Sequence, residues 1–346
     1  MEKNLTSGSV LKNIIYFSLP YLLSYFLQTL YGMADLFIIG QFEGVAGTTA
    51  VSIGSQVMHM ITVMIVGLAM GATVNIGLDY LFMGYFHLGP VGAALGTTLS
   101  QLVTVMIALT VILRQQTGIS LSKEDFKPHR PSMQKILNIG VPVALQDGFI
   151  QIAFIVITII ANRRGPDTAA AVGIVEKIIS FLFLVPSSML STVSALCAQN
   201  IGAKKQDRAS QTLRYGILIA TGFGMIVSII IQFIAGPVVS LFTTDTNVVV
   251  LGGQYLRGYI FDCVFAGIHF CFSGYFCAYG KSGFSFLHNI IAILLVRIPG
   301  VYFTSIWFPD TLFPTGIATA CGALLSVIIC LLVSPVIFLQ STFHFY

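Results

Sequence analysis

Charged residues are scarce in this chain of 346 residues. Only 9% of its residues are Asp, Glu, Lys or Arg, whereas 56% are hydrophobic and the mean hydropathy is +0.90. Soluble globular domains carry about 25% charged residues. The scarcity of charge excludes a water-soluble globule and predicts a polytopic membrane protein.

The sequence also lacks the motifs of several enzyme classes. It contains no Gly-rich phosphate loop, no Gly-x-Ser-x-Gly elbow, no His-Glu-x-x-His arrangement and no C-x-x-C spacing. All its cysteines lie in apolar runs, so we expect them to be small buried side chains: Cys197, Cys263, Cys271, Cys277, Cys321 and Cys330. These absences predict a protein that is not an enzyme, binds no nucleic acid and holds no cofactor.

Long apolar runs dominate what remains. They extend over about 20 residues or more, which is the length of membrane-spanning helices and not of barrel strands. The first run is longer than the apolar core of a signal peptide, so we expect it to stay in the membrane. The expected spans are 14–40, 46–74, 90–113, 134–162, 169–199, 212–241, 247–278, 284–307 and 314–339.

Basic residues predict the orientation of these spans. They gather in the connections 114–135 and 204–214, which should face the cytoplasm together with the N-terminus. Arg163 and Arg164 are the exception, because they fall on an expected outside loop. The pattern predicts a multi-pass protein of the cell membrane with a cytoplasmic N-terminus.

The number of spans reveals an irregularity in the first third of the chain. An even number of crossings must separate the N-terminus from loop 114–135, yet only three full spans do. Residues 75–88 would have to form the fourth, and 14 helical residues reach only about 21 Å across a hydrocarbon core of about 30 Å. A segment is therefore missing or shortened.

An internal repeat indicates where the segment is missing. Lys12–Pro20 resembles Lys135–Pro142, and Ala50-Val51-x-Ile53 resembles Ala171-Val172-x-Ile174, which places the second copy 121 or 122 residues downstream of the first. Pro90–Ala94 resembles Pro314–Ala318 at an offset of 224. The first copy therefore lacks about 103 residues, after Val74. We predict an all-α membrane protein of two helical lobes with about nine full spans and a short one. Its parts are an incomplete first lobe (1–113), a cytoplasmic loop (114–133) and a six-helix second lobe (134–340).

A polar pair inside the apolar run 57–86 is the first candidate site. Carboxylates within a membrane cost several kcal/mol, about 2.5–3.5 on insertion scales, and usually mark an ion or substrate path. Asn75 and Asp79 are four residues apart, so they project from one face of a helix. Asp79 could instead be a buried residue that bonds to backbone groups without titrating.

Other ionisable residues lie within spans of the second half: Asp147, Glu176, Lys177, Asp262 and Arg297. We predict that Asp262 and Arg297 form a mutual ion pair, which would neutralise both. Asp147 could attract a cationic drug or be a satisfied polar residue between helices, and the role of Glu176 and Lys177 is open. The candidate substrate-cleft residues are Gln146, Asp147, Asp262 and Arg297.

Several short motifs together resemble one transporter family. They are Ser18-Leu19-Pro20, Met33-Ala34-Asp35, Asn75 to Asp79 leading into Gly92 to Thr97, Ala198-Gln199-Asn200-x-Gly202-Ala203, and Gly274-Tyr275-Phe276 before Gly280-Lys281. Through these motifs the chain resembles the multidrug and toxic compound extrusion (MATE) family, and the resemblance extends from about Lys12 to about Leu339. The resemblance implies a polyspecific antiporter that exports organic cations in exchange for Na⁺ or H⁺, with two lobes that rock about a central cleft.

The resemblance also implies a cation site made of Asp35, Asn75, Asp79 and Thr97. Their carboxylate, amide and hydroxyl oxygens suit a hard ion such as Na⁺, or one carboxylate could carry a proton. The alternatives are an Asp35 at the membrane interface and a Thr97 that only packs as a small residue beside Gly96. Because of the missing segment, we predict that the four residues do not all converge, which would leave the chain inactive.

Two other classes of function remain open in the sequence. A flippase of the same superfamily that moves lipid-linked oligosaccharides would favour a basic cleft, whereas the cluster here is acidic. A membrane-embedded enzyme is disfavoured because no nucleophile and base pair is present. We expect organic cations or drug-like molecules and the lipid bilayer as partners, and a monomer as the functional unit.

Overall fold

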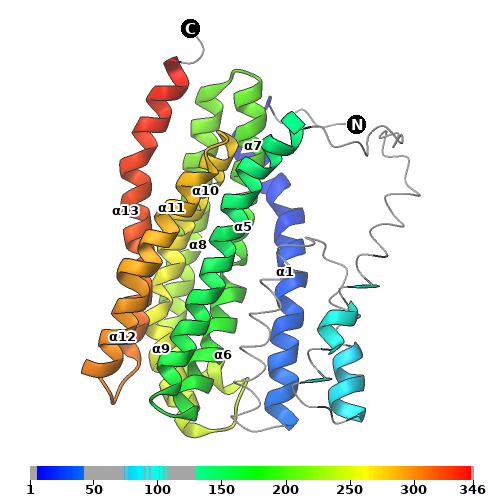
Figure 1. Ribbon diagram of the computed structural model, residues 1–346, viewed down its shortest axis with the longest axis vertical. Coiled ribbons are helices and arrows are strands. Elements are labelled where there is room, and N and C mark those ends of the chain that lie inside the picture. The colour runs from blue at the N-terminus through cyan, green and yellow to red at the C-terminus, as the bar shows by residue number, and fades with distance from the viewer. Residues whose placement is uncertain are drawn as a thin grey trace.

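The computed structural model describes residues 6–42, 74, 77–86, 88, 91–92, 95–100, 102–103, 106 and 130–343. Within these residues every regular element is a helix (Figure 1). Five helices are long and apolar enough to cross a membrane, and a bent pair makes a sixth. The all-α membrane fold is confirmed, whereas the expected span 46–74, most of the span 90–113 and the loop 114–129 lie outside the described residues.

The second half of the chain forms a bundle of six spans. Its elements are α5 (Arg130–Asn162), the bent pair α6 (Pro166–Leu182) and α7 (Leu184–Gly202), α8 (Gln206–Ser240), α9 (Thr246–Tyr259) with α10 (Phe261–Ala278), α11 (Ser282–Ala292) with the π-helix η2 (Ile293–Arg297) and α12 (Ile298–Trp307), and α13 (Phe313–Phe343). The first half contributes α1 (Val10–Phe42) and the short π-helix η1 (Tyr80–Tyr85). Apart from the bend, the six spans match the expected ones to within several residues.

Prolines explain two departures from straight helices. The pair α6 and α7 bends by 42° at Phe183, three residues before Pro186. Pro186 has no N–H to donate to the carbonyl of Leu182, which is a common cause of helix bending. Pro299 likewise cannot donate to the carbonyl of Leu295, and the preceding turn widens into η2. The bundle therefore contains two irregular spans, both in the second lobe.

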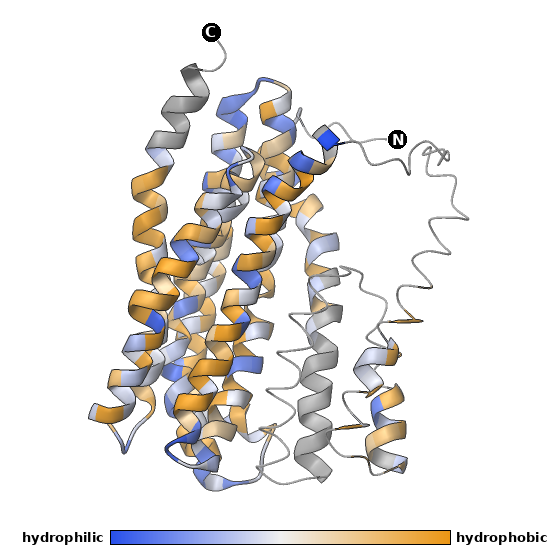
Figure 2. Cartoon of the chain, viewed as in Figure 1, coloured by the Kyte–Doolittle hydropathy of each residue, from blue (hydrophilic) through white to orange (hydrophobic). Residues whose placement is uncertain are grey.

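Apolar side chains fill the bundle in two clusters. One joins α5, α6 and α9, with Ile157, Ile174 and Tyr255 almost fully buried. The other joins α7 and α10 to the N-terminal end of α1 through Ile14. Hydrophilic residues gather at the two ends of the bundle and in short bands within it (Figure 2). Polar side chains are unusual in an apolar interior, so we looked for the candidate sites within these bands.

The cysteines are all free thiols, as the lack of paired spacings predicts. Four of them are buried, and Cys277 is partly buried. The expectation of burial is wrong for Cys321, which is exposed on the outer face of α13. An apolar thiol needs no burial where lipid covers the helix, because lipid is itself an apolar surrounding.

The N-terminal segment is bound to the basic connection between α7 and α8. The ammonium of Lys205 donates to the carbonyl of Thr6 at 2.8 Å, and the guanidinium of Arg208 donates to the carbonyls of Gly8 at 2.9 Å and Ser7 at 3.3 Å. The N-terminus and this basic loop therefore lie at the same end of the molecule. The predicted orientation requires them to share one end, and the side of the membrane on which that end lies stays a prediction.

Glycines allow α9 and α13 to approach closely. A Cβ on Gly258 would collide with the Phe313 carbonyl oxygen and lie 2.9 Å from the Ile317 nitrogen. A Cβ on Gly316 would meet the Tyr259 nitrogen at 2.7 Å from the opposite side. Small residues at such crossings let helix backbones pack together in a membrane. The crossing positions the C-terminal end of α9, which carries Tyr259.

Replacing Gly258 by alanine should separate this crossing. The new methyl group meets backbone atoms that cannot move aside, so we expect the free energy of unfolding to fall by about 1–3 kcal/mol. Thermal unfolding in detergent measures the effect. Gly222→Ala in α8 is the matched control, because a Cβ there meets nothing within 4 Å; equal melting temperatures for the two variants would show that the crossing is not tight.

Candidate functional site

The acidic site of the first lobe is centred on Asp79. This residue immediately precedes η1, and its side chain is fully buried. A Cβ on Gly96 would collide with Oδ1 of Asp79 and lie 3.4 Å from its Cγ, so the carboxylate packs directly against that glycine. Thr97, the next residue, is also buried, with 6% of its surface exposed. Two of the four expected cation-site residues therefore belong to neighbouring segments.

The other two expected ligands are less fully described. Asp35 lies on α1, seven residues before its last residue, but its side chain is outside the described part of the structure. Asn75 also lies outside the described residues. The expected failure of the four residues to converge therefore stays a prediction.

Gly96 provides a way to test the role of the Asp79 carboxylate. In Gly96→Ala the added methyl group would collide with Oδ1 of Asp79 and lie 3.5 Å from the backbone nitrogen of the same residue, so the carboxylate has to move away. We expect a cation-dependent gain in thermal stability to be lost in this variant, measured by melting in Na⁺ and in choline buffers at several pH values. Gly77→Ala is the control, since its Cβ meets no atom within 4 Å. A Gly96→Ala variant that keeps the cation dependence would contradict the role of this contact.

In the second lobe the predicted pair of Asp262 and Arg297 is confirmed. Nη2 of Arg297 lies 2.7 Å from Oδ2 of Asp262, and the side chains are 12% and 2% exposed. The same nitrogen donates to the hydroxyl of Tyr259 at 2.6 Å. The pair joins η2 to the start of α10 inside the bundle, so the two charges neutralise each other there.

Glu176 is a second buried acid of this lobe. Its side chain is 1% exposed in α6, and it accepts a hydrogen bond from the hydroxyl of Thr158 in α5 at 3.4 Å. A second polar contact lies between α9 and α13, where the hydroxyl of Tyr255 is 3.5 Å from that of Thr319. Polar contacts thus connect helices that are far apart in the sequence.

The remaining cleft candidates differ in their surroundings. Gln146 is buried and accepts a hydrogen bond from Ser285 of α11 at 2.6 Å, which is a contact between helices. Asp147 is half-buried in α5. The Tyr25 hydroxyl lies 3.0 Å from that of Ser191 in α7. The contact between Tyr25 and Ser191 therefore joins α1 to the second lobe.

Two histidines form a buried contact that the sequence analysis missed. His288 of α11 is fully buried, and its Nε2 lies 2.9 Å from the hydroxyl of Ser273 in α10. The ring of His269, also in α10, lies 5.7 Å from the ring of His288. The two residues are 19 positions apart on consecutive spans, and no motif pairs them. The only sign of this contact in the sequence is that both histidines lie within apolar runs.

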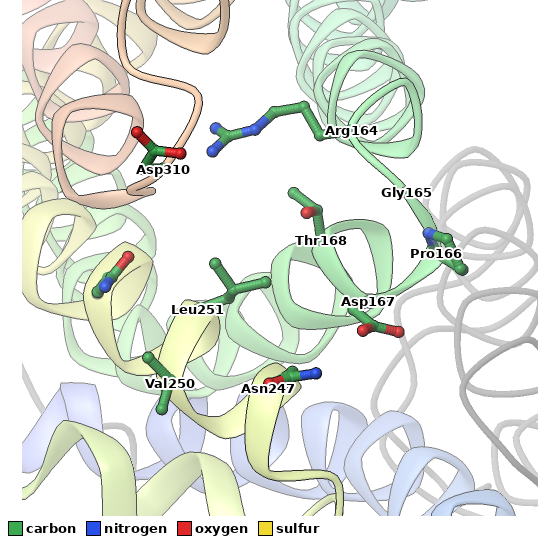
Figure 3. A pocket seen from close by; sticks show the side chains of 10 residues that line it. Arg164, Gly165, Pro166, Asp167, Thr168, Asn247, Val250, Leu251 and Asp310 are labelled. Carbon is green, nitrogen blue, oxygen red and sulfur yellow. The ribbon is translucent and has the colours of Figure 1, made fainter.

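A cavity of about 530 Å³ lies between the turn that joins α5 to α6, the first half of α9 and the loop between α12 and α13 (Figure 3). On one side Arg164 donates hydrogen bonds to the carbonyls of Pro309 and Thr311. Gln254 of α9 accepts from the Leu312 nitrogen at 3.0 Å and holds the same loop. Burial lowers the pKa of the Arg164 guanidinium, although the carboxylate of Asp310 raises it. These contacts fasten the loop between α12 and α13.

Comparisons with known sequences agree on one family. Residues 142–303 match the family described as MatE. The multidrug export protein MepA of Staphylococcus haemolyticus is 28% identical over 247 residues, which cover 71% of this chain and 51% of MepA. The probable multidrug resistance protein NorM of Halalkalibacterium halodurans is 24% identical over 242 residues, or 68% of this chain and 53% of NorM. This chain spans about half the length of these relatives.

Solved structures show the same fold. The crystal structure of MATE in complex with MaL6 matches with a TM-score of 0.76 and 18% identity, covering 99% of each chain. The outward-facing conformation of a multidrug resistance MATE family transporter of the MOP superfamily matches with a TM-score of 0.76 and 19% identity, covering 98% of this chain and 97% of the other. At such identities the likeness concerns the arrangement of helices alone.

Proposed function

Because this chain is a member of the MATE family of membrane transporters, we propose that it is a multidrug efflux antiporter that exports organic cations in exchange for Na⁺ or H⁺. The observation that carries the proposal is Asp79, a carboxylate buried against Gly96 and one residue away from Thr97. A carboxylate buried in a membrane costs free energy, so a protein retains one where an ion must bind. MepA and NorM are named as multidrug proteins, which supports drug-like substrates for this chain.

The second lobe supplies the opposing half of the proposed cleft. Asp147 of α5 is half-buried, and we propose that its charge attracts an organic cation that passes between the lobes. Gln146 fixes α5 against α11 and holds that helix in position. The contacts of Lys205 and Arg208 with residues 6–8 support a cytoplasmic N-terminus in the cell membrane. No further cofactor enters the proposal, and we expect the transporter to act as a monomer.

Reconstituted vesicles test this proposal. We expect purified protein to drive accumulation of ethidium only when a Na⁺ or H⁺ gradient is applied, and protein-free vesicles to show none. Transport by a version that restores the missing residues, but not by this chain, would assign the activity to the family and deny it to this chain. Movement of lipid-linked oligosaccharide without any ethidium transport would favour the flippase instead.

A further inference from the structure

The guanidinium of Arg297 is held in a cage of the kind that recognises organic cations. Its Nη2 is 2.7 Å from Oδ2 of Asp262 and 2.6 Å from the hydroxyl oxygen of Tyr259. The carboxylate supplies a full negative charge and the phenol supplies a neutral acceptor. One nitrogen therefore satisfies two acceptors at once, as the nitrogen of a small free cation would.

Aromatic rings complete the cage. The Cζ of Arg297 lies 5.4 Å from the ring centroid of Phe154 in α5 and 5.5 Å from that of Tyr259 in α9. A cation within about 6 Å of an aromatic face is attracted by the ring, and the attraction grows when the site excludes water. Asp262 is 2% exposed, so water contributes little here. Carboxylate and ring faces together are the chemistry by which proteins bind guanidinium and ammonium ligands.

The backbone segment that carries Arg297 is an irregular helix. Arg297 is the last residue of η2, two residues before Pro299. Its backbone approaches α13 only because Gly322 lacks a side chain, since a Cβ there would lie 3.0 Å from the Cβ of Arg297. The buried Nε of Arg297 has no hydrogen-bond partner among the described residues. The tethered cation therefore leaves one of its donors unused, whereas a free cation could turn to suit the site.

We propose that Phe154, Tyr259 and Asp262 form an organic-cation site in the second lobe, which Arg297 fills as a tethered ligand. While Arg297 is in place, Asp262 is closed to free cations, including a coupling ion. The inference stands on the geometry of the second lobe and does not need the proposed transport activity. It predicts that removing the tether converts the cage into a site for a small guanidinium compound.

Chemical rescue of Arg297→Ala tests this site. The probe is methylguanidinium chloride at millimolar concentration, with KCl at the same concentration as the reference, and the readout is the melting temperature of the whole purified chain in detergent. We expect the variant to melt below the wild type in KCl and to regain stability saturably with methylguanidinium. The wild type, whose cage is filled, should show no saturable gain.

The double variant Asp262→Ala with Arg297→Ala is the matched control, because it lacks both charges and should ignore the probe. Purification of Arg297→Ala in folded form only when methylguanidinium is present would also support the site. The proposal is overturned by equal responses of the single and double variants, or by a single variant that shows no response. Failure of Arg297→Ala to fold with or without the probe would overturn it too, because a free cation then cannot replace the tethered one.

Discussion

Replacing Asp262 by asparagine should lower the free energy of unfolding by about 3–5 kcal/mol, because it strands the charge of Arg297 inside the bundle. In the wild type that charge is neutralised across 2.7 Å. The hydroxyl of Tyr259 remains as an acceptor but carries no charge. Burying an uncompensated charge costs far more than losing one surface ion pair. Denaturant unfolding in detergent measures the loss.

Two further variants separate charge from packing in that result. Asp207→Asn removes an exposed carboxylate near the start of α8 and should change stability by less than about 1 kcal/mol. The double variant Asp262→Asn with Arg297→Met removes both charges and should recover much of the loss, since an apolar replacement of a buried pair is often tolerated. A stability of Asp262→Asn equal to that of Asp207→Asn would show that the buried pair is not important.

Replacing Asp79 by asparagine should abolish ethidium transport driven by a Na⁺ or H⁺ gradient. The substitution keeps the shape of the side chain against Gly96 but removes the charge that we propose binds the ion. Transport should fall to the rate of protein-free vesicles, in whichever of this chain and its version with restored residues transports. Initial rates in reconstituted vesicles provide the measurement.

The exposed Asp207→Asn is again the control for this experiment, because it removes one carboxylate without touching the buried site. Its transport rate should equal that of the wild type. An Asp79→Asn variant that transports as fast as the control would remove Asp79 from the coupling mechanism. Thermal melting of both variants separates loss of ion binding from loss of folding.

The buried ion pair and the long apolar helices could be predicted from the sequence, because the alternatives cost too much free energy. Two opposite charges inside apolar spans have to neutralise each other, and Asp262 and Arg297 do so. Apolar runs of span length predicted the long apolar helices of the second half, because backbone groups in lipid must bond within a helix. These predictions were possible because an unpaired charge or an unbonded backbone group in lipid costs more free energy than the differences between alternative packings of the helices.

Other features depend on contacts that the sequence does not display. His269 and His288 meet because α10 and α11 pack at one particular rotation, which no spacing specifies. The bend at Phe183 and the π-helix η2 follow from prolines, yet other prolines lie inside continuous helices, such as Pro142 in α5. Asp79 was predicted as a site residue, but its contact with Gly96 depends on how two separate segments pack.

The counterflow of ions during export tests the central claim most directly. Vesicles that contain the protein and a pH- or Na⁺-sensitive dye should report ion movement when ethidium is added, with no gradient imposed beforehand. We expect an ion flux opposite to that of ethidium, present in the wild type and absent in Asp79→Asn. Ethidium movement without any opposing flux of Na⁺ or H⁺ would contradict it.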